Sequence, residues 1–511
     1  MKKKKLLLDR FPSTSISFFC NEFKELDFDI EIITYNSNLR GPIKSYEGEL
    51  INDFEVARGS FFKDVPWVLE NKDLEFFSQY EGIFQTMMSR FALSPSYWAN
   101  HEISTHVILL CNYWKYKITN KKIDVCFSFF APHDPSSFSL YLVSKLMKIP
   151  YIFIDMPIVA QSIRFLSCSF KYRNLLIRNG SYKTEDSVKK ILENYQQKIK
   201  TNFFSALPPF MFKKNYLPDK KKLIDKIIEA FDKGDLIKKF FFKLVGRLPR
   251  KIFFKYNRLN WYSDKAIPNW LYLYIEKIKI FRRISKRKKE YDKICSSFVR
   301  ELLGIKYIYF SAPVSPEGST IPTALWNRDI KISILKLLSV IPNDWKIVYK
   351  ANPGQFSKHF LSQFSSFPDW FTSDFYYDLL KTNKVLFTSV DTSSKDLIEN
   401  SMGVASINGT VSVEAIVLGK HAVIFSPMWY DDLEGVHYCE TYDNLKSAIN
   451  LMENSNIPEP KIFNAHLSST SIFIANTLPH KFSENVYKII TEKFISSYKL
   501  FNDLDDRKWS I

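Results

Sequence analysis

The sequence predicts an α/β protein whose two parallel-sheet domains are separated by a basic, mainly helical segment. Strand patterns alternate with helix patterns before residue 171 and again after residue 300, which is typical of parallel sheets. The chain has 511 residues, enough for two or three domains with large cores. Between residues 171 and 300 there are 34 Lys and Arg against 12 Asp and Glu, whereas the remainder holds 38 against 42. One central segment therefore carries the whole positive excess.

The first domain is expected to span residues 1–170. Residues 28–35 form a plausible strand, and apolar residues recur at helical spacing in residues 73–91 and 99–116. These elements predict the first part of an α/β unit.

A strand–helix–strand unit follows within the same domain. Residues 123–130 have the pattern of a buried strand, and Tyr151 to Ile154 return as the next strand. Between them, Asp134 can cap a helix whose first turn suits Pro135. This spacing indicates a βαβ crossover and hence parallel strands.

The segment 171–300 is rich in Lys, Phe and Tyr, and five prolines divide its expected helices into pieces. It ends in the run Arg282-Arg283-Ile284-Ser285-Lys286-Arg287-Lys288-Lys289. One interpretation is a solvated helical insertion. The other is a surface that binds the anionic inner face of a membrane through cations and interleaved aromatics.

The second domain is expected over residues 301–480, with a helical tail over 481–511. Strand patterns and helix patterns alternate through it. The predicted strands cover residues 307–310, 345–350, 384–390 and 403–407, and the predicted helices cover 329–340 and 393–400.

Composition excludes several classes of protein. Hydrophobic residues make up 46% of the chain and aromatic residues 16%, which excludes a disordered protein. The six cysteines are scattered without metal or redox spacing, and the apolar run after the basic N-terminus is too short for a signal peptide. No apolar run approaches a membrane span. We therefore expect a cytoplasmic protein.

Metal and cofactor chemistry has little support in the sequence. The eight histidines show no ligand spacing, and the chain has neither a Walker loop nor a GxSxG nucleophile elbow. No protein-bound metal or cofactor is expected.

The stretch Ser406 to Lys420 reads as a strand, a tight turn, a short helix and a glycine stop. Gly409 allows a close backbone approach, and the helix start suits a phosphate. Glu414, about one turn into the helix, is within reach of hydroxyls on the group that carries the phosphate. An ordinary corner of an α/β fold has the same pattern. The hydroxyls of Thr410 and Ser412 lie at the helix start, where two roles are open: to bind phosphate, or merely to satisfy backbone N–H groups.

Other loops at strand ends supply polar side chains for the same site. Lys350 can neutralise a departing phosphate or be a surface lysine, and Glu317 can contact donor or acceptor hydroxyls or cap a turn. Asn352 and Asn408 lie in the loops that are expected to converge on the cleft.

Transfer of a sugar also needs a group that removes the acceptor proton. His133 and Asp134 are the candidates in the first domain. Asp134 is equally well explained as a helix cap, and a lone loop histidine is weak evidence.

The second half contains, in this order, the motifs Tyr307-Ile308-Tyr309-Phe310 with Pro316-Glu317, Tyr349-Lys350-x-x-Pro353, Gly409-Thr410-x-x-x-Glu414-Ala415-x-x-x-Gly419-Lys420, Trp429-Tyr430 and Gly435-Val436. In these motifs it resembles the capsule polysaccharide biosynthesis family of bacterial glycosyltransferases. The resemblance implies a GT-B architecture, in which two Rossmann-like domains face a cleft, and use of nucleotide-activated sugars at the cytoplasmic membrane. It also implies that Gly409, Thr410 and Glu414 bind the donor.

Two positions depart from this resemblance. Many relatives have His where this chain has Asn352, and Gln where it has Ser315. In the branch that transfers Kdo from a cytidine monophosphate donor, those residues contact the nucleotide. The departures imply either another donor, such as a uridine diphosphate sugar, or lost activity.

We therefore expect a glycosyltransferase that builds a capsular or other surface polysaccharide and is peripheral at the inner membrane. Its partners would be a nucleotide sugar and a lipid-linked or glycan acceptor. The alternative is a non-catalytic scaffold of a glycan assembly complex that binds membrane or polyanion through the basic segment. Nucleic acid is not an expected partner, because no recognised module accompanies the basic residues.

Overall fold

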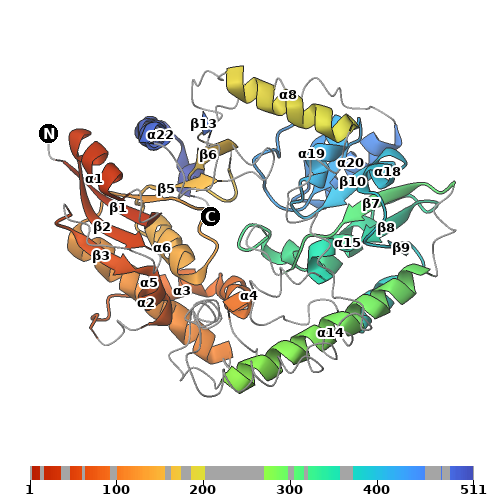
Figure 1. The fold of residues 1–511 in the computed structure, drawn as a ribbon, viewed down its shortest axis with the longest axis horizontal. Helices are drawn as coiled ribbons and strands as arrows, with labels where there is room; N and C mark the ends of the chain where they lie inside the picture. The colour runs from red at the N-terminus through yellow and green to blue at the C-terminus, as the bar shows by residue number, and fades with distance from the viewer. Residues whose placement is uncertain are drawn as a thin grey trace, which may run out of the picture.

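The computed structural model describes most of both predicted domains. The described residues are 3–11, 16–35, 46–59, 64–91, 100–155, 163–173, 176, 186–201, 270–296, 304–315, 320–356, 372–454, 473–474 and 484–509. Figure 1 shows two sheets, each with helices packed around it.

The first sheet has seven strands among the described residues, in the order β13-β6-β5-β4-β1-β2-β3. Its members are β1 (Lys4–Phe11), β2 (Phe28–Tyr35), β3 (Glu49–Asn52), β4 (Val125–Ser128), β5 (Tyr151–Asp155), β6 (Ile163–Ser167) and β13 (Phe473–Ile474). The strands from β3 to β5 in this order are parallel, whereas β6 runs antiparallel to β5 and to β13. The chain order of the parallel strands reverses between β1 and β4.

Helices cover both faces of this sheet because its strands are apolar on both sides. In β1, Leu7 belongs to one buried cluster, and Leu6 and Leu8 belong to the other. The helices that precede β6 are α1 (Ile16–Glu25), α2 (Asp53–Arg58), α3 (Asn71–Ser78), α4 (Glu81–Phe91), α5 (Asn100–Lys121) and α6 (Pro135–Leu146). α3 to α6 pack on the Leu7 side, and α1 packs on the other.

The C-terminal helix α22 (Glu484–Asp503) returns to the first sheet, where it contacts α1, β5 and β6. Phe494 of α22 stacks on Phe127 of β4 with ring centroids 4.3 Å apart. The short 3-10 helix η6 (Asp506–Trp509) follows, and Lys145 of α6 donates to the Lys508 carbonyl there. The first core therefore contains residues from both ends of the chain.

The second sheet is parallel throughout, in the order β12-β11-β10-β7-β8-β9. Its strands are β7 (Tyr307–Ser311), β8 (Lys346–Lys350), β9 (Val385–Thr388), β10 (Gly403–Ser406), β11 (Ala422–Ile424) and β12 (Val436–Tyr438). This order is that of a Rossmann sheet, and it reverses between β7 and β10.

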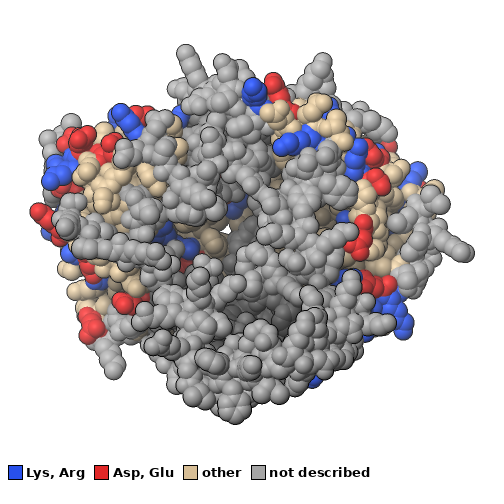
Figure 2. All heavy atoms as spheres, in the orientation of Figure 1, with Lys and Arg blue, Asp and Glu red and all other residues tan. Residues whose placement is uncertain are grey.

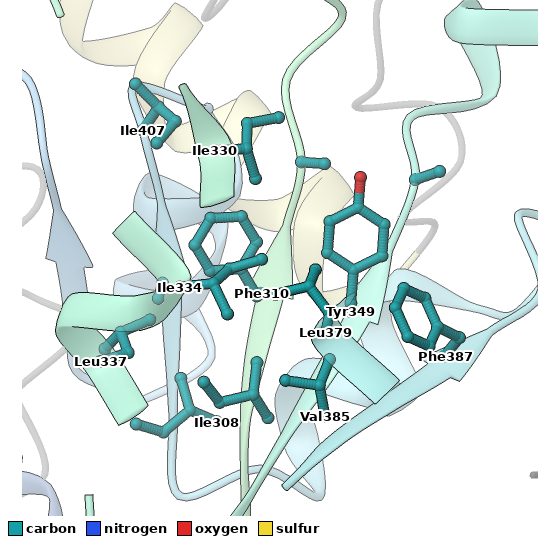
Figure 3. Close-up of a cluster of buried hydrophobic side chains, with 14 of the residues drawn as sticks. Ile308, Phe310, Ile330, Ile334, Leu337, Tyr349, Leu379, Val385, Phe387 and Ile407 are labelled. Atoms are coloured by element: carbon teal, nitrogen blue, oxygen red, sulfur yellow. The ribbon is translucent and has the colours of Figure 1, made fainter. Parts of the chain in front are cut away.

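Apolar side chains from the strands and helices of this domain interlock in a closely packed core, as Figure 3 shows around Phe310 and Tyr349. The helices are η3 (Leu325–Arg328), α15 (Ile330–Leu338), η4 (Pro353–Phe356), α17 (Ser373–Leu380), α18 (Ser394–Glu399), α19 (Val411–Val417) and α20 (Tyr442–Glu453).

Two helices from the basic segment also pack on the second domain. Tyr195 and Ile199 of α8 (Asp186–Thr201) join the core beside α19. Tyr291 of α14 (Trp270–Ser296) donates through its hydroxyl to the Thr388 carbonyl and accepts from the Ala351 N–H, at 2.7 and 2.9 Å. The helices α8 and α14 thus pack on opposite faces of the second sheet.

The predicted α/β class with two Rossmann-like, mainly parallel sheets is confirmed. The bulk of the predicted basic insertion, residues 202–269, lies outside the described residues. Sequence periodicity did not predict β1, because Leu6, Leu7 and Leu8 were interpreted only as a short apolar run. The boundaries predicted for the domains stay predictions.

On the face drawn in Figure 2, basic and acidic side chains of the described residues are interspersed. No described helix is both long enough and apolar enough to cross a membrane.

Candidate functional site

The loops after β7 and β10 meet at the point where the strand order of the second sheet reverses. Thr320, in the loop after β7, donates to the side-chain oxygen of Asn408 in the loop after β10 at 3.5 Å. In open α/β sheets, ligands bind at the carboxyl ends of the strands beside such a reversal. The predicted residues Asn408, Gly409 and Thr410 therefore occupy the favoured ligand position of this fold.

Gly409 is held by hydrogen bonds on both sides of its peptide. Its N–H donates to Ser406 Oγ at 2.9 Å, and its carbonyl accepts from the Tyr430 hydroxyl at 2.7 Å. A Cβ here would lie 3.3 Å from both Ser406 Oγ and Val411 Cγ1. A side chain at this position would require Ser406 and Val411 to shift by a few tenths of an ångström, so the constraint on Gly409 is this crowding and not a left-handed φ.

Glu414 is buried beneath this turn. Its carboxylate accepts from Thr410 Oγ1 at 3.3 Å, and burial raises its pKa to about 7 even though Thr410 and Lys350 oppose the rise. The negative charge of Glu414 also contributes to the raised pKa values of two nearby phenols, Tyr195 and Tyr309. At neutral pH this carboxyl lies near its titration midpoint.

The hydroxyls of Thr410 and Ser412 are engaged within the domain. Thr410 is the N-cap residue of α19, but its hydroxyl makes no cap hydrogen bond. Ser412 Oγ lies 3.3 Å from Ser406 Oγ. The interpretation that these hydroxyls cap the helix is wrong for Thr410.

Lys350, at the end of β8, points into the domain. Its Nζ donates to the Thr392 carbonyl at 2.5 Å and to Ser394 Oγ at 2.8 Å. Burial lowers its pKa to about 8, against the charges of Glu414 and Asp391, which favour the protonated form. It is not the surface lysine that one interpretation allowed.

The two positions that depart from the resemblance stabilise a loop. Asn352 accepts the Gly354 N–H through its side chain at 2.9 Å. The backbone of Ser315 exchanges two hydrogen bonds with the Gln355 side chain, each 2.9 Å long. Glu317 lies outside the described residues.

His133 and Asp134 lie in the loop after β4, where the strand order of the first sheet reverses. His133 Nδ1 lies 2.6 Å from the Ala131 carbonyl, which can only accept a hydrogen bond. The proton of a neutral His133 is therefore on Nδ1, and the lone pair is on Nε2. Asp134 accepts from the Ser137 N–H as the N-cap of α6 and also pairs with Arg10.

Sequence reasoning missed the acidic cluster around this pair, which consists of Asp9, Asp53 and Asp134 with Arg10. All four side chains are buried, and Arg10 Nε lies 3.7 Å from Asp53 Oδ2. Burial, followed by the charge of Asp134, raises the pKa of Asp53 to about 8. The cluster therefore holds a proton at neutral pH. Prediction of β1 as a strand would have placed Asp9 and Arg10 at this edge.

Sequence reasoning also missed Arg173, which follows β6. Its guanidinium lies 3.4 Å from Asp155 Oδ2 at the end of β5, and it donates to Thr323 Oγ1 at 3.2 Å. Thr323 belongs to the loop after β7. This contact joins the carboxyl end of β5 to the loop after β7, so the two domains meet with the carboxyl edges of their sheets toward each other. That arrangement defines a protein with a GT-B-like fold.

No family model matches the chain, and no curated protein is detectably similar to it. Solved structures give weak matches. UDP-GlcNAc 2-epimerase from Methanocaldococcus jannaschii is 10% identical, with 91% of this chain and 98% of that chain covered and a TM-score of 0.25. A glycosyltransferase from Rickettsia africae is 11% identical, with 99% and 100% covered and a TM-score of 0.23.

The β-Kdo 2,7 transferase KpsC of Thermosulfurimonas dismutans is 14% identical over 42% of this chain and 62% of that chain, with a TM-score of 0.23. Similarities at this level carry no argument about the function of this chain.

Proposed function

We propose that this protein is a metal-independent glycosyltransferase that takes a sugar from a nucleotide-activated donor and extends a capsular or other cell-surface polysaccharide. The observation that carries the proposal is the meeting of Asn408, Gly409 and Thr410 with the loop after β7 at the switch point of a Rossmann sheet. The facing edge of the first sheet presents groups that can carry a proton.

The donor would bind at the second sheet. Asn408, Gly409 and Thr410 would contact it directly, with Ser412 nearby, and Glu317 stays a candidate from the sequence alone. Glu414 would act from below through Thr410, whose hydroxyl donates to its carboxylate. Lys350 and Asn352 would support the walls of the site, because both side chains are held by hydrogen bonds within the domain.

The acceptor would bind at the first sheet, where His133 is the preferred base. A neutral imidazole with its lone pair on Nε2 is ready to accept a proton from a sugar hydroxyl. Asp134 is less suited to this role, since it pairs with Arg10 and caps α6. The acidic cluster would then share the proton that is released.

Calorimetric titration of the full chain with UDP and CMP tests this proposal. We expect one of the two nucleotides to bind, and we expect Glu414→Ala to abolish that binding while the protein stays folded. Glu434→Ala is the matched control, because Glu434 is exposed and lies beyond β11. Absence of binding to either nucleotide by the wild type would refute the assignment.

A non-catalytic scaffold is the second candidate, and the internal engagement of Lys350 and Asn352 favours it. Lys350 Nζ uses two of its three N–H donors in these bonds, and the bonded atom of Asn352 is Oδ1, an acceptor that cannot donate to a phosphate. Incubation of purified protein with radiolabelled UDP-sugars and a lipid-linked glycan separates the two candidates. Transfer of label to the acceptor would exclude a scaffold.

The site of action would be the cytoplasmic face of the membrane, with the basic segment as the contact to anionic lipid. Its 34 Lys and Arg against 12 Asp and Glu support this proposal. Sedimentation with liposomes containing phosphatidylglycerol should retain the protein at low salt and release it at high salt. Equal retention on neutral liposomes, or preference for RNA, would contradict a lipid-binding role.

A further inference from the structure

Arg173 belongs to the basic segment by sequence, yet it is buried at the contact between the two domains, with 5% of its surface exposed. A hydrogen-bonded turn fixes its backbone. The Arg173 carbonyl accepts from Ser167 Oγ at 3.0 Å, and the Tyr172 N–H donates to Ser169 Oγ at 3.1 Å. The side chain therefore starts from a defined position beside the end of β6.

The guanidinium of Arg173 has weak partners for a buried cation. Its Nη2 donates to the neutral Thr323 hydroxyl at 3.2 Å, and its Nη1 donates to the Met428 sulfur at 3.5 Å. Within the described part of the chain, its Nε has no hydrogen-bond partner. The anion beside it is Asp155, at 3.4 Å.

These contacts leave most of the hydrogen-bonding capacity of Arg173 for another group. A guanidinium has five N–H donors in a planar fork, which match the oxygens of a carboxylate or a phosphate. A thioether is a weak acceptor, and a buried cation with incomplete hydrogen bonding is costly. Replacement of Met428 and Thr323 by phosphate oxygens would satisfy more of these donors.

Arg173 also lies beside the candidate donor site. Met428 is two residues before Tyr430, whose hydroxyl donates to the Gly409 carbonyl. Arg173 is near enough to the Tyr430 phenol to oppose the rise in its pKa. Thr323 lies in the same loop as Thr320, which contacts Asn408. Arg173 thus contacts both sides of the switch point from the opposite domain.

We propose that Arg173 binds a phosphate group of the donor nucleotide. The inference rests on the proposed function and adds to it a phosphate ligand from the first domain. Lys350 is less suited to this purpose, because two of its three Nζ donors are already bonded to Thr392 and Ser394.

Titration of the full chain with a nucleotide and with the nucleoside that lacks its phosphate tests this role. The probes are UDP with uridine, and CMP with cytidine. We expect Arg173→Gln to weaken binding of the nucleotide by about tenfold or more, as for loss of charge-assisted hydrogen bonds, and to leave the nucleoside affinity unchanged. Lys171→Gln is the matched control, since Lys171 lies in the same turn and pairs with Glu440 in an exposed position.

Asp155→Asn provides a second variant if Arg173→Gln does not fold, which thermal denaturation would reveal. Asp155 competes with phosphate for Arg173, so its neutralisation should strengthen nucleotide binding relative to nucleoside binding. If Arg173 merely holds the domains together, Asp155→Asn should lower the affinities for nucleotide and nucleoside alike or change neither. Either result would overturn the inference.

The outcomes separate this inference from the function that it rests on. Wild-type binding of a nucleotide, together with equal binding by a folded Arg173→Gln protein, would overturn the role of Arg173 and leave the donor site standing. Failure of the wild type to bind either nucleotide would overturn both. A loss that is confined to the phosphate-bearing probes supports the inference.

Discussion

Glu414 shows how burial changes the role that a residue type suggests. A glutamate one helical turn after a glycine was expected to contact hydroxyls of a ligand. It is instead 5% exposed, bonded to Thr410 and near Lys350. In the proposed donor site, a change at Glu414 would therefore reach the ligand through Thr410.

The raised pKa of Glu414 predicts a pH-dependent stability that Glu414→Gln removes. The folded protein retains a proton up to about pH 7, whereas an unfolded glutamate loses it near 4.5. The contribution of Glu414 is therefore complete below pH 4.5 and is lost as pH rises through 7, by up to about 3 kcal/mol. Between pH 5 and 8, the variant should become progressively more stable than the wild type.

Urea unfolding at several pH values measures this difference. Glu434→Gln, at an exposed position, should give a constant difference from the wild type. Unfolding free energies of wild type and Glu414→Gln that run parallel with pH would show that Glu414 is ionised throughout.

At the scale of the element, α19 is a seven-residue helix that depends on its two ends. At its N-terminal end, the Ser412 N–H donates to the Gly409 carbonyl at 3.2 Å. Its C-terminus is followed by Gly419 at φ 74°, a left-handed conformation. A side chain at this position is strained, because its Cβ crowds the backbone. The glycine stop predicted after this helix is present.

Gly419→Ala should destabilise the protein by about 1 kcal/mol, since alanine adopts this conformation with strain. Asparagine tolerates the left-handed region better, so Gly419→Asn should cost less. Chemical denaturation of the two variants measures the order. Equal losses from both substitutions would assign the effect to packing rather than to backbone conformation.

At the scale of the whole molecule, the C-terminal helix α22 packs on the first domain, a contact between distant parts of the chain that the sequence did not predict. Phe494 lies fully buried against Phe127 and contacts Phe23 and Phe28 through their rings. The helix fills a face of the first sheet that would otherwise expose apolar side chains. The core of the first domain thus includes side chains of α22.

Phe494→Ala should lower the free energy of unfolding by about 3–5 kcal/mol, as for other buried phenylalanines. Tyr377→Ala is the control, because half of Tyr377 is exposed on α17 and its loss should change stability by about 0.5 kcal/mol or less. Thermal unfolding followed by circular dichroism measures both. A small effect of Phe494→Ala would mean that α22 contributes little to the first core.

The local pattern of the chain determined several strands of both domains and the start of one helix. Residues 28–35 and the strands near Tyr307, Lys346 and Gly403 have apolar patterns strong enough to be recognised. Asp134 was correctly allowed as a cap because capping depends on the three residues that follow it. Strand patterns and helix caps depend on residues that are neighbours in the sequence, so they can be predicted from residue type and spacing.

Only the tertiary structure decided which charged groups meet. Asp9, Arg10, Asp53 and Asp134 come together through strand pairing, and Arg173 reaches Asp155 and Thr323 through the facing of two domains. The burial that moves the pKa values of Glu414, Lys350 and Asp53 also comes from distant residues. Because desolvation and charge depend on distance in space, the sequence alone determined the folding units but not the chemistry at the contact between them.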